Sequence, residues 1–292
     1  MTIETIVPRL IWTVSAQLGE GPAWFEREQA LRFVDIKGGR LHRYVPASGA
    51  RETIDCGGMP SFVLPHAGGG AVIGSRNGIY QLEGSVLGRL ITAINMPAHN
   101  RTNDATVDVR GRIWLGTMDD EEKVASGAFY CLDEAGLHLI DGEAVVTNGP
   151  AMSIDGRILY QVDSANRQIW RCAIGEGPEI ESRDLFLEFT KYDGHPDGIV
   201  LDSEDCLWVA MWDGWSVRRF SPAGKLLQQV DLPCARVTKI AFGGPDLRTA
   251  YVTTARCGLD EDALQAQPLA GSLFAFDAPA AGNILPEAKL PR

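Results

Sequence analysis

The stretch NGPAMSIDGRILYQVDSANRQIWRCAIGEG, residues 148–177, contains one complete structural repeat. A short apolar run leads into a turn at Gly, a β-rich run and a second turn follow, and another apolar run ends in a polar loop. DGIVLDSEDCLWVAMWDGWSVRRFSPAGKLL, residues 197–227, has the same order. Further units begin at Glu20, Ser61, Asn103 and Thr238, so six units account for almost the whole chain.

The spacing of these units, about 40 to 50 residues, is typical of a four-stranded propeller blade. Helical repeats have a similar period, but the runs ILYQV, CLWVAMW and IWLGTM are rich in β-branched and aromatic residues and lack a period near 3.6. We predict an all-β fold, a six-bladed β-propeller with four-stranded blades around a central channel, forming one domain over residues 1–292. Residues Thr5 to Val14 lie outside the six units and are expected to supply the outer strand of the last blade.

One position of the repeat carries polar side chains, which are unfavourable in a β core unless something is bound there. Aligning the units on the apolar residue of the first strand places six residues at an equivalent position four residues earlier: Glu20, Pro60, Asn103, Asn148, Asp197 and Thr238. The first strand of each blade lines the channel, so these residues should form a ring at one mouth. Four of the six are oxygen donors, and a divalent cation would relieve repulsion between the two carboxylates.

With amide carbonyls completing the shell, calcium is the first choice of metal, and zinc, manganese and iron(II) stay open. Asn148 and Asp197 each precede a glycine, so either residue taken alone also fits a plain turn. The recurrence of the pattern in four units favours a site.

The composition excludes several classes of function. The formal net charge of −11 disfavours binding to nucleic acid or to an anionic membrane. No run approaches the roughly 20 apolar residues of a membrane span, and the first residues do not form a secretory signal, so a cytoplasmic protein is expected. Six cysteines without a CxxC pair indicate free thiols in a reducing compartment.

Several motifs together resemble the senescence-marker-protein, regucalcin and gluconolactonase family of six-bladed propellers. They are LGEGPAW (18–24), LRFVDIKGGRLHRY (31–44), NRTNDATVDVRGRIWLGTM (100–118), TNGPAMSIDGRILYQVDS (147–164), HPDGIVLDSEDCLWVAMW (195–212) and FGGPDLRTAYVTTARCGL (242–259). The resemblance covers nearly the full length of the chain.

The resemblance implies a metal-dependent hydrolase that opens a sugar-acid lactone such as glucono-, xylono-, arabinono- or galactonolactone. It places the metal ligands at Glu20, Asn148 and Asp197. Substrate contacts would be Arg101, Asn103 and Glu121. We expect Asp197 to act also as the general base for the attacking water, although activation of that water by the metal itself stays open.

Two other functions remain compatible with the same residues. One is a calcium-binding regulatory protein without catalysis, and the other is a metal-dependent aryl ester or phosphoester hydrolase, to which Trp212 and Trp215 would contribute. His195 and His99 lie beside the motifs, and His195 is a possible base or substrate contact. No Ser in a GxSxG setting appears, which disfavours a covalent acyl-enzyme. The identity of the sugar and the oligomeric state stay open.

Overall fold

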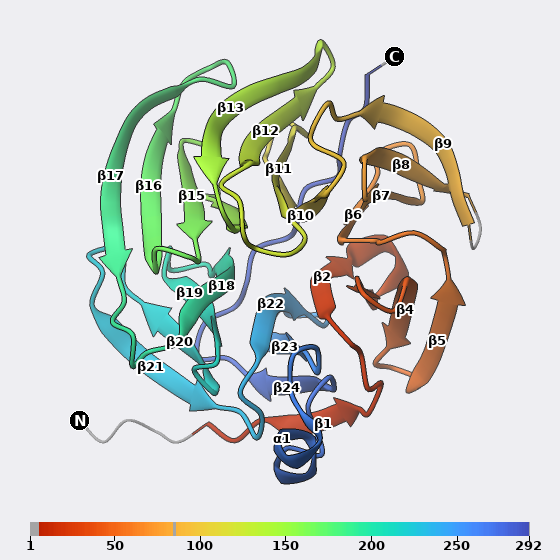
Figure 1. Ribbon diagram of the computed structural model, residues 1–292, viewed down its shortest axis with the longest axis vertical. Helices are drawn as coiled ribbons and strands as arrows, with labels where there is room; N and C mark the ends of the chain where they lie inside the picture. The colour runs from red at the N-terminus through yellow and green to blue at the C-terminus, as the bar shows by residue number, and fades with distance from the viewer. Residues whose placement is uncertain (1–5, 84–85, 292) are drawn as a thin grey trace.

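Six four-stranded antiparallel sheets surround a central channel in the computed structural model, which describes residues 6–83 and 86–291 (Figure 1). Each sheet is one blade. In five sheets the strand that comes first in the chain lies innermost and the later strands step outward, whereas in the sixth the first strand of the chain lies outermost. The predicted all-β, six-bladed propeller is confirmed.

The blades follow one another around the ring in chain order. Blade 1 consists of β2 (Gly19–Phe25), β3 (Ala30–Asp35), β4 (Arg40–Val45) and β5 (Ala50–Asp55). Blade 2 consists of β6 (Phe62–Pro65), β7 (Ala71–Ser75), β8 (Gly78–Glu83) and β9 (Val86–Ala93). Blade 3 consists of β10 (Asn100–Val107), β11 (Ile113–Asp119), β12 (Gly127–Asp133) and β13 (Gly136–Ala144).

The remaining three blades contain the other half of the chain together with the first strand. Blade 4 consists of β14 (Thr147–Met152), β15 (Ile158–Asp163), β16 (Gln168–Ile174) and β17 (Ile180–Glu188). Blade 5 consists of β18 (His195–Leu201), β19 (Leu207–Trp212), β20 (Ser216–Phe220) and β21 (Leu226–Asp231). Blade 6 consists of β22 (Val237–Gly243), β23 (Thr249–Thr254), β24 (Leu273–Asp277) and β1 (Arg9–Trp12). The short helices are η1 (Glu26–Glu28) and α1 (Glu261–Ala266).

Buried aspartates fix the turn between the first and second strands of two blades. Asp202 Oδ2 accepts hydrogen bonds from Trp208 Nε1 at 2.9 Å and from Arg219 Nε at 2.7 Å. In blade 3, Asp108 Oδ2 accepts in the same way from Trp114 Nε1 at 2.9 Å. Charge-assisted bonds of this kind stabilise a buried carboxylate and give the turn one conformation. The recurrence of Asp before Trp in the repeat is therefore structural.

The hydrophobic core lies between neighbouring blades. Trp208 of blade 5 packs edge-to-face on Phe242 of blade 6, with ring centroids 6.1 Å apart, and both side chains belong to one buried cluster. Phe62 of blade 2 and Val107 of blade 3 share another cluster. Because each blade buries both faces against its neighbours, no blade has a complete core of its own.

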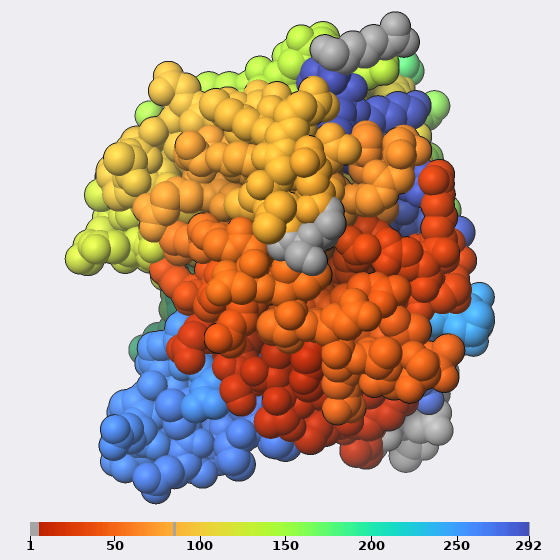
Figure 2. Space-filling model, turned by 90° about the vertical axis from the view of Figure 1, so that its right-hand side faces the viewer, coloured from red at the N-terminus to blue at the C-terminus, as the bar shows by residue number. Residues whose placement is uncertain are grey.

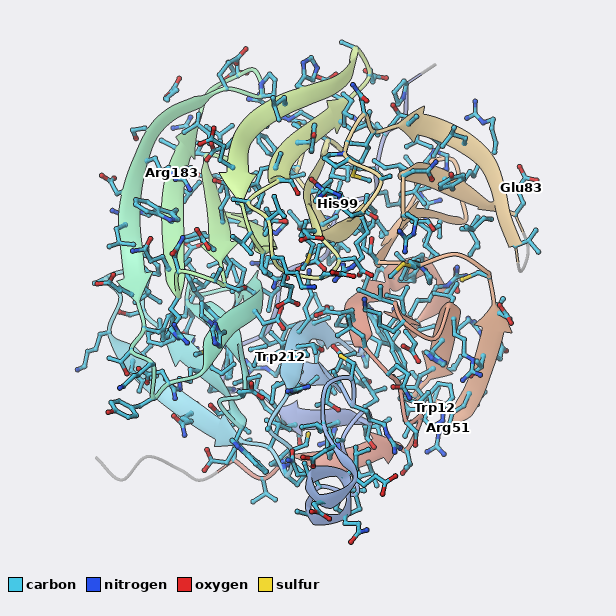
Figure 3. All side chains as sticks on the ribbon, viewed as in Figure 1. Trp12, Arg51, Glu83, His99, Arg183 and Trp212 are labelled. Atoms are coloured by element: carbon cyan, nitrogen blue, oxygen red, sulfur yellow. The ribbon has the colours of Figure 1, made fainter. Side chains whose placement is uncertain are left out.

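The two ends of the chain meet in blade 6, where β1 pairs antiparallel with β24. Trp12 packs edge-to-face against Phe33 and His42 of blade 1, and Arg51 donates a 2.5 Å hydrogen bond to the carbonyl of Ile11 (labels in Figure 3). The expected outer strand is thus confirmed for Arg9–Trp12, whereas Thr5 lies outside the described residues.

A small apolar cavity of about 100 Å³ occupies the end of the channel where the innermost strands finish. The six apolar residues used to align the repeats all line it: Trp24, Leu64, Val107, Met152, Leu201 and Phe242. Residues 283–286 of the C-terminal segment close it from outside, and Ala288 continues that segment onto blade 2 by a 2.8 Å backbone bond to Pro65. The alignment of the six units is therefore confirmed at this end of the channel.

All six cysteines are free, as expected, and five of them are buried. Within residues 6–83 and 86–291, no helix has the length and hydrophobicity that a bilayer span requires.

The closure of the ring leads to a stability prediction. Replacing Trp12 by Ala removes the aromatic contacts that β1 makes with blade 1, and we expect the free energy of unfolding to fall by about 2 kcal/mol. Leu10→Ala is the matched control in the same strand, because Leu10 is 45% exposed and should cost less than about 1 kcal/mol. Urea denaturation measures both values, and equal losses would contradict a closing role for Trp12.

Candidate metal centre and active site

A β-bulge occurs at the ring position in each of the four blades whose ring residue is an oxygen donor. In β2, for example, Glu20 is opposite Val34 but Ala23 is opposite Arg32, so the inner strand contains one extra residue. The other bulges lie between Thr102 and Ala105, between Asn148 and Ala151, and between Pro196 and Ile199. In β22 the pairing also shifts, between Val237 and Lys239, so five of the six inner strands share the irregularity, whereas in β6 pairing is regular from Phe62 to Pro65. Bulges redirect side chains, and here they turn the donors into the channel.

The glycine that follows Glu20 is required by this geometry. Gly21 has φ +51°, and a Cβ atom there would lie 2.9 Å from the Cα of Phe62. Both the left-handed backbone and the close contact exclude a larger residue. The Glu-Gly-Pro order of blade 1 is therefore a structural condition for placing the Glu20 carboxylate.

The four donors line one cavity of about 580 Å³ at the end of the channel where the innermost strands begin: Glu20, Asn103, Asn148 and Asp197. Oxygen atoms gather around the centre of the disc in Figure 3. The loop after β11 and the segment around α1 project from the same side of the disc in Figure 2, and residues of both, Glu122 and Cys257 among them, contribute to the cavity wall. Thr238 takes a structural role instead, donating a 2.6 Å hydrogen bond to the carbonyl of Gly19.

A chain of hydrogen bonds fixes the two asparagines. Asn103 Nδ2 donates to Asn148 Oδ1 at 2.8 Å, and Asn148 Nδ2 donates to Ser164 Oγ at 3.0 Å. Ser164 Oγ in turn donates to the carbonyl of Pro196 at 2.6 Å, next to Asp197. The chain connects blades 3, 4 and 5, and it assigns the amide orientation of both asparagines.

Glu20 and Asp197 are buried carboxylates with little compensation for their charge. Their exposed fractions are 6% and 5%. Burial, with repulsion from Asp104, raises the pKa of Glu20 to about 8, and burial, with repulsion from Glu20, raises the pKa of Asp197 well above its usual range. Asp197 Oδ1 has no hydrogen-bond partner. An unpartnered buried oxygen beside a second carboxylate is an arrangement that a bound cation stabilises.

The residues present fit a hard divalent cation. Glu20 and Asp197 offer carboxylate oxygens, and Asn148 offers an amide oxygen, all on the rigid inner strands. The donor set therefore mixes carboxylates with amides. In the described residues there is no group of three or more His, Cys, Asp or Glu side chains arranged to hold a metal.

Arg101 lies beside these donors and is 3% exposed. Its Nη1 donates to Asn103 Oδ1 at 2.5 Å and its Nε donates to Asp120 Oδ1 at 2.7 Å, an oxygen that Lys37 also contacts at 2.6 Å. The structure therefore brings Arg101 and Asn103 together at the cavity wall.

Glu121 is separated from the other predicted site residues. Its side chain is 68% exposed and pairs with Lys123 at 2.7 Å, and it does not line the cavity. Glu122, with φ +58°, lines the cavity instead. The left-handed backbone at Glu122 reverses the direction of the loop, so adjacent acidic residues have opposite surroundings.

Both ring nitrogens of His195 are engaged. Arg167 Nη2 can only donate, so His195 Nε2 accepts at 2.9 Å, and Nδ1 donates to the carbonyl of Ser164 at 2.9 Å. His195 lines the cavity in this neutral tautomer, which leaves neither nitrogen free to accept a proton from water. His99 contacts Ser126 at 3.3 Å and does not line the cavity.

The cavity wall also contains side chains that the repeat did not indicate, namely Lys37, Asp120, Glu122 and Arg236. They come from loops, where no periodic signal exists, although the acidic run after β11 is visible in the sequence. Trp212 lines the cavity with Arg236 4.8 Å above its ring centre, whereas Trp215 is 45% exposed and lies elsewhere.

Comparison with known proteins identifies the family of this chain. The family model described as "SMP-30/Gluconolactonase/LRE-like region" matches residues 18–256. A 6-deoxy-6-sulfogluconolactonase of Pseudomonas putida is 37% identical, with 88% of this chain and 90% of the relative covered. A pentonolactonase of Haloferax volcanii is 33% identical, with 97% of both covered.

Among solved structures, a calcium-binding regucalcin of Agrobacterium tumefaciens superposes with a TM-score of 0.93 at 26% identity, covering 99% of this chain and 100% of that one. The match extends over all six blades and includes the strands that hold the donors. The chain belongs to the SMP-30/gluconolactonase/LRE-like family.

Proposed function

We propose that this protein is a sugar lactonase that uses one divalent metal ion to open an aldonolactone to the free acid. The observation that carries the proposal is the convergence of two buried carboxylates with raised pKa values and two amides fixed by hydrogen bonds in one cavity of about 580 Å³. The named activities of the Pseudomonas and Haloferax relatives support a sugar lactone as substrate.

Glu20, Asn148 and Asp197 would hold the metal. Calcium is our first choice because the donors are hard oxygens and because the Agrobacterium protein is described as calcium-binding, with zinc, manganese and iron(II) as alternatives. When bound, a divalent cation polarises the lactone carbonyl and offsets the charge that develops on its oxygen.

The chain's own residues would orient the reactants. Asp197 is the proposed general base, because its partnerless Oδ1 is an acceptor that can take a proton from the attacking water. Arg101 and Asn103 would bind hydroxyl groups of the sugar, and their mutual 2.5 Å hydrogen bond holds both in one geometry before substrate arrives.

The direct test is hydrolysis of glucono-, xylono-, arabinono- and galactonolactone by metal-stripped protein, with and without added calcium, manganese, zinc or iron(II). We expect metal to restore turnover of at least one lactone, and Asp197→Asn to lower kcat at least about 100-fold because an amide cannot take a proton from water. Retained calcium binding in this isosteric variant would separate the role of base from that of ligand. Substantial turnover by Asp197→Asn would sink the assignment.

Two alternatives are separated by the same assay. Tight calcium binding without turnover of any lactone would favour a binding protein. Preference for an aryl ester or a phosphoester would favour the broader hydrolase, for which Trp212 in the cavity wall is the supporting observation.

The raised pKa of Glu20 leads to a prediction about stability. A carboxyl with a higher pKa in the folded protein binds more protons when folded, so the free energy of unfolding falls as pH rises between the two pKa values. For Glu20 this interval runs from 4.5 to about 8. Metal-free protein should therefore lose a few kcal/mol of stability across it, and Glu20→Gln should lose markedly less.

Denaturant unfolding in a chelating buffer at several pH values measures this effect. Added calcium should flatten the profile of the wild type and leave that of Glu20→Gln unchanged. Parallel profiles for the two metal-free proteins would show that Glu20 is not the titrating group.

The contrast between Glu121 and Glu122 provides a matched pair. Glu122→Gln removes a charge from the cavity wall, and we expect the KM for the lactone to rise about tenfold, which corresponds to the lower end of the range for a hydrogen bond to a charged group. Glu121→Gln should stay within about twofold, because that carboxylate faces Lys123 outside the cavity. Steady-state kinetics of both variants measure the two KM values. A larger increase in KM for Glu121→Gln than for Glu122→Gln would restore Glu121 as the substrate contact.

We further propose that the chain is a single propeller domain located in the cytoplasm, with a small sugar lactone rather than nucleic acid or membrane as its partner. The shared blade 6 supports the first point, and six free thiols support the second. The net charge of −11 supports the choice of partner.

A further inference from the structure

A buried ion pair crosses the channel beneath the proposed metal centre. Lys239 Nζ on β22 donates to Asp104 Oδ1 on β10 and lies 3.4 Å from the carbonyl of Ala105. The side chains of Lys239 and Asp104 are 8% and 3% exposed. They join blades 3 and 6, which lie opposite each other in the ring (Figure 1).

The pair lies directly next to the ring of donors. Asp104 follows Asn103 and Lys239 follows Thr238, so each is one residue further along its strand than the ring position. Lys239 lines the small apolar cavity at the other end of the channel. Neither Asp104 nor Lys239 lines the larger cavity, so the ion pair is adjacent to the donors along the strands without being part of that cavity wall.

Asp104 is a third carboxylate close to the two proposed charged ligands. Its negative charge acts on both Glu20 and Asp197, and the positive charge of Lys239 opposes it at both. Asp104 Oδ2 is buried without a hydrogen-bond partner. Asp104 Oδ1 accepts from Lys239 Nζ and, at 2.7 Å, from the backbone N of Ala105, so Lys239 is the side chain that neutralises it. A carboxylate with a free oxygen is a potential ligand for a hard cation.

The backbone is shaped to accommodate Lys239. A Cβ atom at Gly198 would lie 2.4 Å from Lys239 Cγ and 2.5 Å from Lys239 Cβ. Only glycine after Asp197 therefore leaves room for the lysine stem. The Asp197-Gly198 dipeptide therefore contributes the proposed base and, at its glycine, leaves room for the side chain of Lys239.

We propose that Lys239 is a positioning residue of the metal centre, which holds Asp104 in an ion pair and so keeps this third carboxylate out of the ligand set. The inference rests on the proposed metal site and adds to it the reason why only two carboxylates serve there. Glu20 and Asp197 together carry a charge of −2, which one divalent cation balances. Freed from Lys239, Asp104 would raise that charge to −3.

The experiment measures calcium affinity, not turnover, by isothermal titration calorimetry on full-length metal-stripped protein at pH 8. Lys239→Met keeps the length of the side chain without its charge and should bind calcium at least about tenfold more tightly. Asp104→Asn leaves the lysine charge uncompensated and should bind at least about tenfold more weakly. The double variant D104N/K239M should return to within about threefold of the wild type.

A purely structural ion pair would give a different pattern. Both single variants would then weaken binding in proportion to their loss of thermal stability, or leave it unchanged, and either result overturns the proposal. Where Lys239→Met fails to fold, Asp104→Asn and the double variant decide, since recovery of affinity in the double variant supports the proposal and equal weakness overturns it. Absence of calcium and manganese binding in the wild type would overturn the metal centre itself, whereas unchanged variants of a protein that binds calcium overturn only the role of Lys239.

Discussion

The site depends on the repulsion between two carboxylates buried in one channel. Glu20 and Asp197 come from blades 1 and 5, and burial removes the water that would otherwise screen them. Such an arrangement persists in a folded protein only where a cation, a proton or a fixed positive charge compensates it. Burial raises the pKa of both groups, with repulsion from Asp104 added at Glu20 and repulsion from Glu20 added at Asp197. Asp197 Oδ1 has no hydrogen-bond partner that would offset its burial.

The fold tolerates that cost because the ring is rigid. Each blade packs both faces against its neighbours, and β1 closes the ring by pairing with β24. The free energy gained by packing blade against blade offsets the cost of burying polar groups along the channel axis. A bulge at the same place in five inner strands interrupts the regular alternation of side chains, and in four of these strands the residue at the bulge is a donor that lines the cavity.

Predictability differed between the strands and the loops. The donors Glu20, Asn103, Asn148 and Asp197 were recognisable because they recur at one position of a repeat, and the structure brings all four to one cavity. Glu121 and Glu122 lie in a loop without periodicity, where a single left-handed residue decides which carboxylate faces inward. His195 was visible as a candidate base, but its engagement by Arg167 and Ser164 depends on contacts across blade boundaries.

The sequence by itself determined the six-bladed architecture, the family and the ring of oxygen donors, because a repeat of fixed length gives each blade the same hydrophobic pattern and places equivalent residues around one axis. Only the tertiary structure decided which loop carboxylate enters the cavity, which nitrogens of His195 are occupied and that Lys239 meets Asp104. These contacts join residues far apart in the chain, 135 positions in the case of Asp104 and Lys239, and they arise only when the ring closes. Local sequence carries no signal for a pairing whose two partners are brought together by the packing of every blade between them.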